Sequence, residues 1–511
     1  MIATRTLVAD GLTPVGAYAA LREADAEGAS FLLESVVGGE RWGRFSILGY
    51  RPTYEAILDR TGWKLRPGSG ARPDSVLPDL KLPGRDAGVP KTLSLADAQD
   101  ALRAIEPLFR ALGGAADRDA AQLEGQAARF AAAHVGYLAW DVVHLIEKVP
   151  PGDQATWDRH FLPLARFLGG ATIVVFDALA QTVTIAASSE EAIDRALADL
   201  SRAPRLSSLA PPDRTHIPSD VSVDLSDEEY KTRVRQAQEY IAAGDAFQIV
   251  LARTFSVPRA GRDAFDVYRA MRLLNPSPYM YFLDLPPAPG ETQRTRIAGA
   301  SPETMVRLEG GTMTVRPLAG TRRRGRTPEE DLALEKELLA DPKERAEHVM
   351  LIDLGRNDVG RVAQIGSVEL VKRMEIERFS HVMHIVSEVR GKVAEGTPPL
   401  EVVRAAFPAG TLSGAPKIRA MQIIRELEAR PRGIYGGAIG YVATTADLDF
   451  AIAIRTMVEK GDTFEVTAGA GIVEASDPQA EADETRSKAR AVLCAIEAAP
   501  PIAGTAAVPT P

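Results

Sequence analysis

The chain has 511 residues, of which 45% are hydrophobic and 25% are charged, and its formal net charge is −9. This length is too great for one small core, and the negative charge argues against a protein that grips nucleic acid across a broad basic face. A small anionic substrate is compatible with this charge, because it needs only a local basic pocket. The single cysteine, Cys494, excludes an internal disulfide and a cysteine-rich zinc site. This low cysteine content predicts a reduced, cytoplasmic protein. Since the sequence has no apolar run of about 18 residues, we also expect that it does not span a membrane.

Residues 1–200 are predicted to form an α+β domain, because short β-rich runs alternate with helical patterns. The β-rich runs are SFLLESVV at 30–37, RFSILGY at 44–50, GATIVVFDA at 170–178 and TVTIAA at 182–187, and the clearest helical pattern is EEAIDRALADL at 190–200. Two stretches rich in glycine and small or polar residues, 83–92 and 111–126, are predicted to be surface loops.

A linker is predicted at 201–225, where four prolines stand in a stretch without an apolar period. The second predicted domain, 226–494, begins with a helix that has a Ser/Asp cap and ends at Gly244. Beyond this helix, glycine-punctuated strands alternate with several long helices. The last residues, 495–511, hold too little apolar surface to pack, so we expect a disordered tail.

Two helical segments each carry a pair of carboxylates three residues apart, Glu344 with Glu347 and Glu481 with Glu484. This spacing places both members of a pair on one helix face. An exposed acidic face is the simple interpretation. If the four carboxylates face one another, they repel unless a cation lies between them, and an all-oxygen donor set favours Mg²⁺ over zinc or copper. A di-iron centre is excluded, because its Glu-x-x-His motif would need a glutamate at Arg345.

Three of the seven histidines, His348, His381 and His384, fall within 37 residues, and the last two have the i, i+3 spacing of one helix face. A histidine on an apolar helix is more often a core residue than a catalyst. The closeness of this group to the acidic helix leaves a catalytic role open. In the turn GTLSGAPK at 410–417, the hydroxyls of Thr411 and Ser413 and free backbone N–H groups could hold a carboxylate.

Glycines gather in IYGGAIGY at 434–441 and in AGAGIV at 468–473. Such glycines mark either a close approach of the backbone to a ligand or a bulge in a strand. Arg455 is predicted to lie inside a strand, as a charge in the otherwise apolar run AIAIRTM at 451–457, where burial is costly without an anion. We therefore predict a bound carboxylate as the partner of Arg455.

The motifs of the second domain, in their order, resemble those of the chorismate-utilising enzymes. They are GDAFQIVLARTF, NPSPYMYF, GASPE, RPLAGTRRRG, ERAEHVMLIDLGRNDVGRV, FSHVMHIVSEV, GTLSGAPK, YGGAIGY, AIRTM, GAGIV and EADETRSKA. In the first domain, LLES and GRFSILG resemble the large subunits of anthranilate synthase in particular. So many motifs in one order make an accidental likeness implausible. The resemblance implies the α+β fold of the anthranilate synthase type, with two antiparallel-sheet-rich domains and helices packed outside.

The resemblance also implies an enzyme that converts chorismate and ammonia into anthranilate and pyruvate, the first committed step of tryptophan biosynthesis. Glu303, in the family's SPE motif, is then the general acid for the departing C4 hydroxyl, a role that requires a raised pKa. His384 is expected near the ring carboxylate or as a base in aromatisation, and Thr411 is expected to orient the ring. Arg455 would bind the enolpyruvyl carboxylate. The further implied residues are Tyr435, Gly469, Gly471 and Lys488 at the substrate, and Glu344, Glu347, Glu481 and Glu484 at Mg²⁺.

Two positions separate this chain from sibling enzymes of the same family. Aminodeoxychorismate synthases have a nucleophilic lysine where this chain has Ala319, which cannot attack the ring. Isochorismate and salicylate synthases have a lysine that activates water where this chain has Gln248, which cannot act as that base. Ammonia, already nucleophilic, is therefore the better-fitting reactant. Arg323 replaces the usual proline of an RPRG turn, a change that concerns the rigidity of the loop and not the reaction.

Feedback inhibition by tryptophan is implied as well, through a pocket between LLES and NPSPYMYF. Its expected residues are Glu34, Ser35, Arg44, Pro276, Ser277, Tyr279, Met280 and Tyr441. The expected partner is a glutamine amidotransferase subunit that supplies ammonia, in a heterotetramer of two large and two small subunits. The alternatives are a sibling chorismate enzyme of the kinds named above and a tryptophan sensor without catalysis, which would have little need for a general acid such as Glu303.

Overall fold

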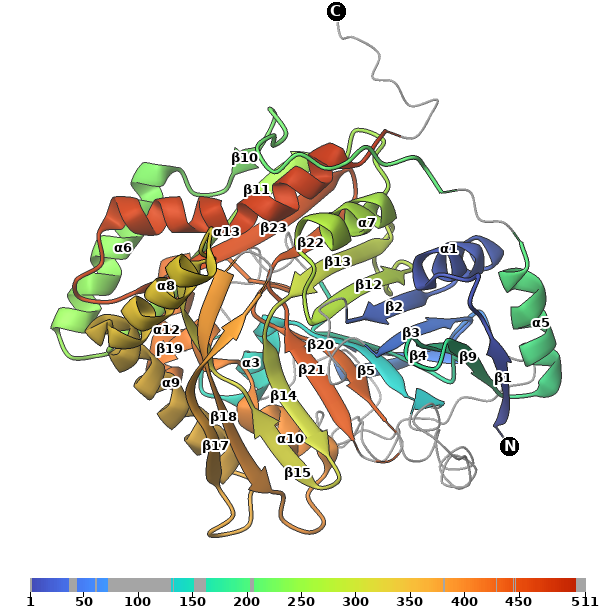
Figure 1. The fold of residues 1–511 in the computed structure, drawn as a ribbon, viewed down its shortest axis with the longest axis horizontal. Helices are drawn as coiled ribbons and strands as arrows, with labels where there is room; N and C mark the ends of the chain where they lie inside the picture. Colours follow the sequence, from blue (N-terminus) through green and yellow to red (C-terminus); the bar gives the residue numbers. More distant parts are fainter. Residues whose placement is uncertain are drawn as a thin grey trace, which may run out of the picture.

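The computed structural model describes residues 2–35, 44–59, 62–71, 130–131, 133–150, 162–202, 206–379, 382–428, 430–443, 445 and 447–501. The loops predicted at 83–92 and 111–126, His381 and the end of the predicted tail, 502–511, lie outside these residues. In the described part, two large antiparallel sheets form the centre and helices pack around them (Figure 1). The α+β fold class predicted from the sequence is therefore confirmed.

The larger sheet has 12 strands in the described residues, and its order mixes early and late segments of the chain. The strands follow as β1 (Ala3–Val8), β9 (Thr182–Ala187), β8 (Thr172–Asp177), β3 (Phe45–Tyr50), β2 (Ser30–Glu34), β12 (Tyr279–Leu285), β13 (Thr295–Ser301), β22 (Thr456–Lys460), β23 (Thr463–Ile472), β11 (Gln248–Pro258) and β10 (Ser222–Val223), with β19 (Gly414–Ala415) beside β11. At the middle of this order β2 pairs with β12, so that Glu34 lies opposite Met280.

The smaller sheet has 11 strands in the same part of the chain. Its order is β16 (Leu318–Arg323), β18 (Val382–Lys392), β15 (Thr312–Val315), β14 (Thr304–Glu309), β21 (Leu448–Ile452), β20 (Ala438–Val442), β6 (His134–Leu138), β7 (Ala165–Gly169), β4 (Tyr54–Asp59) and β5 (Gly62–Pro67), with β17 (Glu369–Arg378) beside β18. Strands from both predicted domains thus share both sheets, while the boundary at 201–225 stays a prediction.

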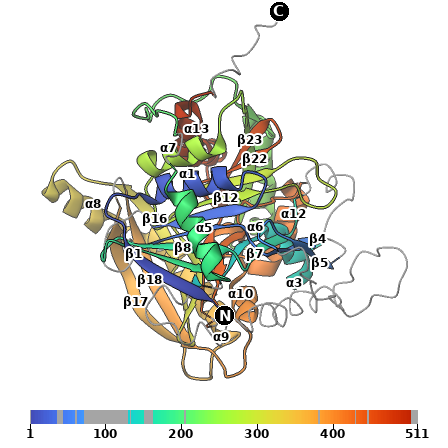
Figure 2. The ribbon, with the colours of Figure 1, turned by 90° about the vertical axis from the view of Figure 1, so that its right-hand side faces the viewer.

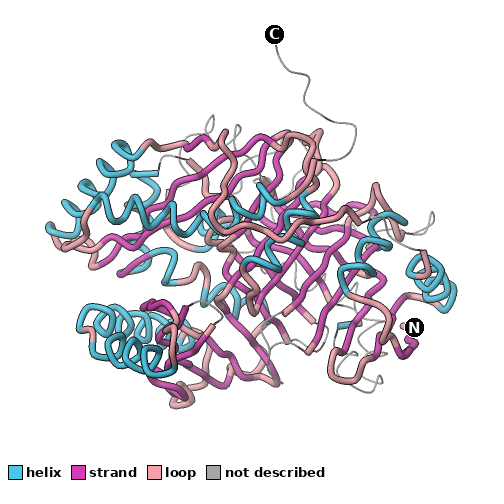
Figure 3. The backbone as a smooth tube through the Cα atoms, turned by 45° about the horizontal axis from the view of Figure 1, so that its top comes forward, coloured by secondary structure: helices cyan, strands magenta, loops and turns pink. Residues whose placement is uncertain are grey.

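The helices lie mainly at the periphery, around the strands (Figure 3). They are α1 (Pro14–Ala24), α3 (Val143–Ile146), α5 (Glu190–Leu200), α6 (Asp227–Ala242), α7 (Ala264–Leu274), α8 (Pro328–Ala340), α9 (Pro342–Gly360), α10 (Pro399–Ala406), α11 (Gly410–Ser413), α12 (Lys417–Glu428) and α13 (Pro478–Ala498), with a 3₁₀ turn at Trp140–Val142. Helices α1, α5, α7 and α13 share one apolar cluster with the larger sheet, and α1 and α5 pack against each other (Figure 2). A separate cluster joins Phe31 and Ile47 of the larger sheet to Val135 and Ile439 of the smaller one. The two sheets therefore bury apolar faces against each other.

The helix predicted to open the second domain is α6, and it begins as the sequence indicates. The Ser226 hydroxyl accepts from the backbone N–H of Glu229, and the Glu229 carboxylate accepts from the backbone N–H of Ser226. This reciprocal capping box satisfies two backbone donors that the first turn leaves without helical partners. The helix ends at Ala242, and Gly244 follows with φ +85°, a left-handed conformation that glycine adopts without strain.

The tail predicted to be disordered from residue 495 is wrong at its start. Helix α13 continues to Ala498, and Ala495 and Ile496 are fully buried. These residues extend the apolar stripe of α13 onto the larger sheet, and burial of that stripe stabilises the last turn. No helix in the described ranges is long and apolar enough to cross a membrane.

Candidate active site

Glu303 lies where the chain crosses from one sheet to the other, between the end of β13 at Ser301 and the start of β14 at Thr304. Its side chain is only 6% exposed, and Thr411 Oγ1 donates a hydrogen bond to Glu303 Oε1 at 3.0 Å. Burial raises the pKa of Glu303 to about 8, although the hydrogen bond from Thr411 lowers it. The carboxyl is therefore protonated near neutral pH, which is the state a general acid requires.

Arg455 was expected inside an apolar strand, and this placement is wrong. The residue stands in the short connection between β21 and β22, with φ +52°. A non-glycine residue in this region is uncommon, and such strain is found preferentially at functional sites. Burial lowers the pKa of Arg455, and its Nη1 donates to the backbone oxygen of Lys488 at 2.8 Å. The guanidinium keeps further donors available for an anion.

Tyr435 and Lys488 lie beside Arg455, and Gly469 lies beside both of them. Lys488 Nζ donates to the backbone oxygen of Gly469 at 2.9 Å and pairs with Glu484 Oε1 at 2.6 Å. A Cβ at position 469 would lie only 2.7 Å from the Tyr435 hydroxyl. Glycine is therefore needed there because the tyrosine approaches the backbone closely.

Gln248 and Gly471 form the neighbouring wall. Gln248 Nε2 donates to Glu347 Oε1 at 3.0 Å, and a Cβ at position 471 would lie 2.7 Å from the same nitrogen. Since β11 pairs with β23 and places Val250 opposite Gly471, the sheet itself holds the glutamine amide beside the glycine. The amide serves as a donor to a carboxylate, and an amide cannot take a proton as a general base.

The four predicted metal ligands stand as two separate pairs. In the described part of the chain, no three His, Cys, Asp or Glu side chains lie close enough together to hold a metal ion. Burial and the neighbouring carboxylate raise the pKa of Glu344 and that of Glu481. Arg322 lies 3.2 Å from Glu344, and the charge of Lys343 at the start of α9 reaches Glu481 on α13. The oxygen donors fit Mg²⁺ chemically, and the metal assignment stays a prediction.

His384 lies on strand β18, so the helix spacing seen in the sequence is wrong here. Its Nδ1 lies 3.0 Å from the backbone oxygen of Gly320. Burial lowers the pKa of His384 to about 4, so the ring is neutral at pH 7. A carbonyl oxygen only accepts, so Nδ1 carries the proton and Nε2 keeps its lone pair. His384 can therefore receive a proton at Nε2, as a base in aromatisation would.

His348 has a structural environment. It is fully buried, and its Nε2 lies 2.8 Å from the Ser387 hydroxyl. Ser387 also accepts from the backbone N–H of Met374 at 2.9 Å. This chain of contacts fixes α9 against β17 and β18, and burial lowers the pKa of His348 to about 4. The core interpretation is favoured for this histidine.

A cavity of about 840 Å³ lies between strands of the two sheets, and we call it the large cavity. Six of the eight residues predicted to bind tryptophan line it: Glu34, Ser35, Arg44, Tyr279, Met280 and Tyr441. Pro276 and Ser277 are not among its lining residues, and the Ser277 hydroxyl donates to the backbone oxygen of Asn275 at 3.1 Å. The two segments named in the sequence therefore meet at one cavity.

Two of the charged groups in this cavity already have partners. Glu34 accepts from the Tyr268 hydroxyl at 2.5 Å and pairs with Arg272 at 2.9 Å. Arg44 pairs with Asp177 at 2.7 Å. The Ser35 hydroxyl is buried and has no hydrogen-bond partner among the described residues. This hydroxyl is available to a ligand, since a buried hydroxyl without a partner is costly.

The chain is similar to known proteins, and these identify its family. Residues 87–494 match the family described as chorismate binding enzyme. The chain belongs to the chorismate-binding enzymes. Anthranilate synthase component 1 of Streptomyces coelicolor is 42% identical over 506 residues, covering 96% of this chain and 88% of that protein. The Aquifex aeolicus component 1 is 40% identical, covering 96% and 94%.

Solved structures of chorismate-binding enzymes share the fold described above. Anthranilate synthase component I from Streptococcus pneumoniae is 33% identical, covers 90% of this chain and 94% of its own, and has a TM-score of 0.67. The menaquinone-specific isochorismate synthase of Escherichia coli is 17% identical, covers 97% and 95%, and has a TM-score of 0.66. That low identity supports the shared fold alone.

Sequence reasoning missed two buried cations of this chorismate-binding enzyme. Lys417 Nζ lies 2.7 Å from Asp358 Oδ1, which ties the GTLSGAPK turn to α9. Arg432 donates to the backbone oxygens of Leu412 and Val250 at 2.8 and 2.7 Å. The signal available in the sequence was a lysine directly after a turn of small residues and an arginine between proline and glycine. Neither signal indicates which distant backbone the cation will reach.

Proposed function

We propose that the chain is the large subunit of an anthranilate synthase, which forms anthranilate and pyruvate from chorismate and ammonia. The observation that carries the proposal is the buried Glu303, whose raised pKa of about 8 keeps a transferable proton beside the Thr411 hydroxyl. The similarity to component 1 proteins along nearly the whole chain supports the same activity. A protein that only sensed tryptophan would gain nothing from a protonated carboxyl held in this way.

The reaction requires one proton to be given and another to be taken. As the ammonia nitrogen bonds to C2 of the ring, the C4–O bond breaks, and Glu303 donates its proton so that the hydroxyl leaves as water. After the new C–N group has lost a proton to solvent, removal of the C2 hydrogen and cleavage of the C3–O bond aromatise the ring. His384 Nε2, with its lone pair free, takes the C2 proton in this step. The enolpyruvate that leaves takes a proton from solvent at its methylene carbon and becomes pyruvate.

The carboxylates of chorismate need fixed cations and donors. Arg455 would bind the enolpyruvyl carboxylate, with Tyr435 and the backbone between Gly469 and Gly471 completing that side. Glu344, Glu347, Glu481 and Glu484 would hold Mg²⁺, which when bound supplies positive charge for the ring carboxylate. Thr411 would orient the ring through its contact with the acid, and Lys488 would hold strand β23 at Gly469.

Two positions of the chain bear on the choice of nucleophile, because neither carries the amine that a sibling reaction requires. Ala319 carries no amine, and the Gln248 amide is committed to Glu347, so neither a covalent lysine adduct nor an activated water is supported. We propose that ammonia comes from a glutamine amidotransferase subunit, because Cys494 is buried in α13 with its Sγ against the backbone oxygen of Arg214. The assembly would hold two large and two small subunits, with tryptophan as inhibitor in the large cavity.

Product identification tests this function directly. Purified chain is incubated with chorismate and Mg²⁺, once with an ammonium salt and once with glutamine, and anthranilate is followed by its fluorescence. We expect anthranilate with ammonium and none with glutamine. Isochorismate, salicylate or a 4-amino product would assign the chain to a sibling activity. Tryptophan binding without any turnover of chorismate would instead favour the sensor.

A further inference from the structure

A second cavity, of about 320 Å³, adjoins the large cavity, and Glu303 lines it. The two cavities share five lining residues, which are Pro278, Tyr279, Thr304, Arg316 and Glu377. A common wall therefore separates the predicted tryptophan residues from the proposed acid. A ligand in the large cavity would contact residues that also line the cavity of Glu303.

A chain of hydrogen bonds runs through that wall in one direction. The hydroxyls of Thr304 and Tyr279 lie 2.8 Å apart, and the Tyr279 hydroxyl donates to Asp449 Oδ1 at 2.8 Å. A tyrosine hydroxyl has a single proton and a carboxylate only accepts, so Thr304 must donate to Tyr279. Burial raises the pKa of Tyr279 well above its usual value, and the hydroxyl keeps this proton at every working pH.

The backbone reinforces the same path. Tyr279 lies opposite Ser301 in the pairing of β12 with β13, and Met280 of the same strand lies opposite Glu34 of β2. Two residues after Ser301 the chain reaches Glu303, whose backbone oxygen accepts from the N–H of Ile452 at 3.1 Å. Neighbouring side chains of an extended chain point to opposite sides. Thr304 accordingly reaches the tyrosine while Glu303 reaches Thr411.

We propose that Thr304 and Tyr279 are positioning residues for Glu303. The hydrogen bonds from Thr304 through Tyr279 to Asp449 fix the segment that carries the acid, and they transmit to it the binding of an amino acid beside Tyr279 and Met280. This inference rests on the proposed function, because it takes Glu303 as the acid and the large cavity as the effector site. A ligand can shift the acid only through a difference in contacts between two states, and the shared wall supplies that difference.

Thr304→Val tests the positioning role, because it removes the hydroxyl and keeps the shape of a side chain that is 6% exposed. We expect kcat with ammonium to fall about 3- to 10-fold, with the KM for chorismate within about twofold. The alkaline limb of the pH profile of kcat should also shift, because loss of the Thr304 hydroxyl alters the surroundings of the Glu303 carboxyl. Thr304→Ser keeps the donor and should restore kcat to within about twofold of wild type.

The coupling is measured with L-tryptophan as the probe. Direct binding to Thr304→Val should stay within about threefold of wild type, while the factor by which saturating tryptophan weakens chorismate binding should fall towards 1. Tyr18→Phe is the matched control: it removes a buried tyrosine–serine contact of 2.8 Å, to Ser30, and Tyr18 lines neither of the two cavities. It should leave both kcat and the coupling factor as in wild type.

The possible results distinguish a failure of this inference from a failure of the proposed function. No anthranilate from the wild type would overturn the proposed function and the inference with it. An active wild type that ignores tryptophan would overturn the transmission, and the kcat and pH profile of Thr304→Val would still decide positioning. Wild-type kcat, pH profile and coupling in Thr304→Val, or equal losses in Tyr18→Phe, would overturn the whole inference.

Discussion

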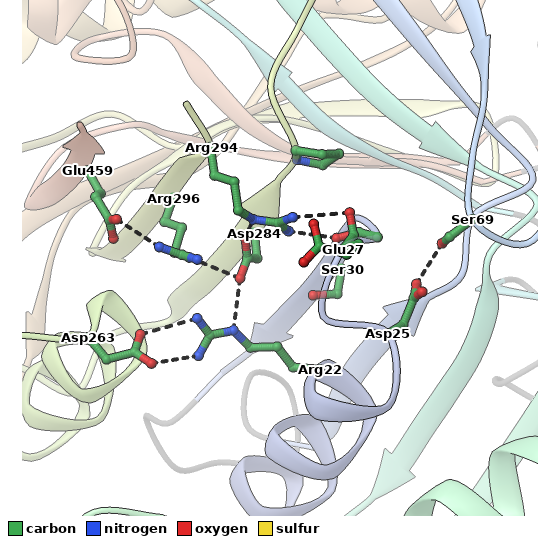
Figure 4. A network of polar contacts seen from close by, with 12 residues as sticks. Arg22, Asp25, Glu27, Ser30, Ser69, Asp263, Asp284, Arg294, Arg296 and Glu459 are labelled. Carbon is green, nitrogen blue, oxygen red and sulfur yellow. Dashed lines mark hydrogen bonds and ion pairs between the residues drawn. The ribbon is translucent and has the colours of Figure 1, made fainter. Parts of the chain in front are cut away.

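Arg22 of α1 donates from Nε to Oδ2 of Asp284 on β12 at 2.8 Å, joining segments far apart in the chain (Figure 4). Arg294 and Arg296 donate to the same carboxylate at 2.9 and 3.0 Å, and Arg22 also reaches Asp263 at the start of α7. Asp284 is thus a buried anion that three guanidiniums share. Because β12 also pairs with β2, this network anchors α1, α7 and β13 to a strand that lines the large cavity.

Asp284→Asn should destabilise the fold by about 3 kcal/mol, because it leaves three partly buried guanidiniums without their shared anion. Burial by itself would raise the pKa of Asp284, but the guanidiniums of Arg22 and Arg296 hold it below its usual value. A carboxyl whose folded pKa is lowered contributes stability above its unfolded pKa, and this stability is lost as the pH falls through the folded pKa.

Urea unfolding at pH 7 and at pH 3 checks this expectation. The difference between wild type and Asp284→Asn should be large at pH 7 and smaller at pH 3. The control is Asp25→Asn, which removes the carboxylate that accepts from Ser69 at 2.6 Å on the surface (Figure 4) and should change stability by less than about 0.5 kcal/mol. Equal midpoints for wild type and Asp284→Asn would contradict the role of the network.

Glu303→Gln should lower kcat by about 10²- to 10⁴-fold, since the amide keeps the shape but has no acidic proton. The pKa of Glu303 is raised to about 8, so wild-type activity should fall as the pH rises through about 8 and the proton is lost. Thr411→Val removes a hydrogen bond that lowers this pKa, and its alkaline limb should therefore lie at higher pH than in wild type.

Stability gives an independent readout of the same group. A carboxyl whose folded pKa is raised contributes its full share below its unfolded pKa and loses it as the pH rises through the folded pKa. Glu303→Gln should consequently become more stable relative to wild type between about pH 5 and 9. An unchanged alkaline limb in Thr411→Val, together with no gain in stability for Glu303→Gln, would contradict a raised pKa of Glu303.

Local sequence signals were sufficient to predict features of the fold and of the site that depend on a single segment of the chain. Ser226 and Glu229 reveal the start of α6 because a capping box is complete within four residues. The glycine at 469 and the acid at 303 could be named from motifs for the same reason. The pairing of Glu34 with Arg272 could not, because it depends on β2 lying beside β12 and on α7 covering both. Arg455 was misplaced because a single apolar run contains both β21 and the turn after it.

Glu344→Gln or Glu481→Gln should abolish Mg²⁺-dependent activity without unfolding the chain. Each change removes one member of a like-charged pair, whose repulsion contributes to the raised pKa of Glu344 and of Glu481, so the melting temperature should stay level or rise. Activity measured against Mg²⁺ concentration, together with a circular-dichroism melt, checks both points. Asp483→Asn on α13 is the matched control, because its exposed side chain contacts Arg486 and Gln479, each at 3.2 Å, on the same helix. Full activity in both glutamine variants would refute the metal assignment.

Ser35→Phe should remove inhibition by tryptophan while leaving chorismate turnover intact. The Ser35 hydroxyl lines the large cavity, and it is one of the buried side-chain polar groups that have no hydrogen-bond partner among the described residues. A phenyl ring there would occupy the space that an indole needs between Met280 and Tyr441.

Ser35→Ala is the milder companion, since it removes only the hydroxyl and should weaken tryptophan binding by about 2- to 12-fold. Chorismate kinetics with and without tryptophan, alongside direct tryptophan binding, distinguish the two variants. If Ser35→Phe is inhibited as strongly as wild type, tryptophan does not bind beside Ser35, and the effector site must be sought elsewhere.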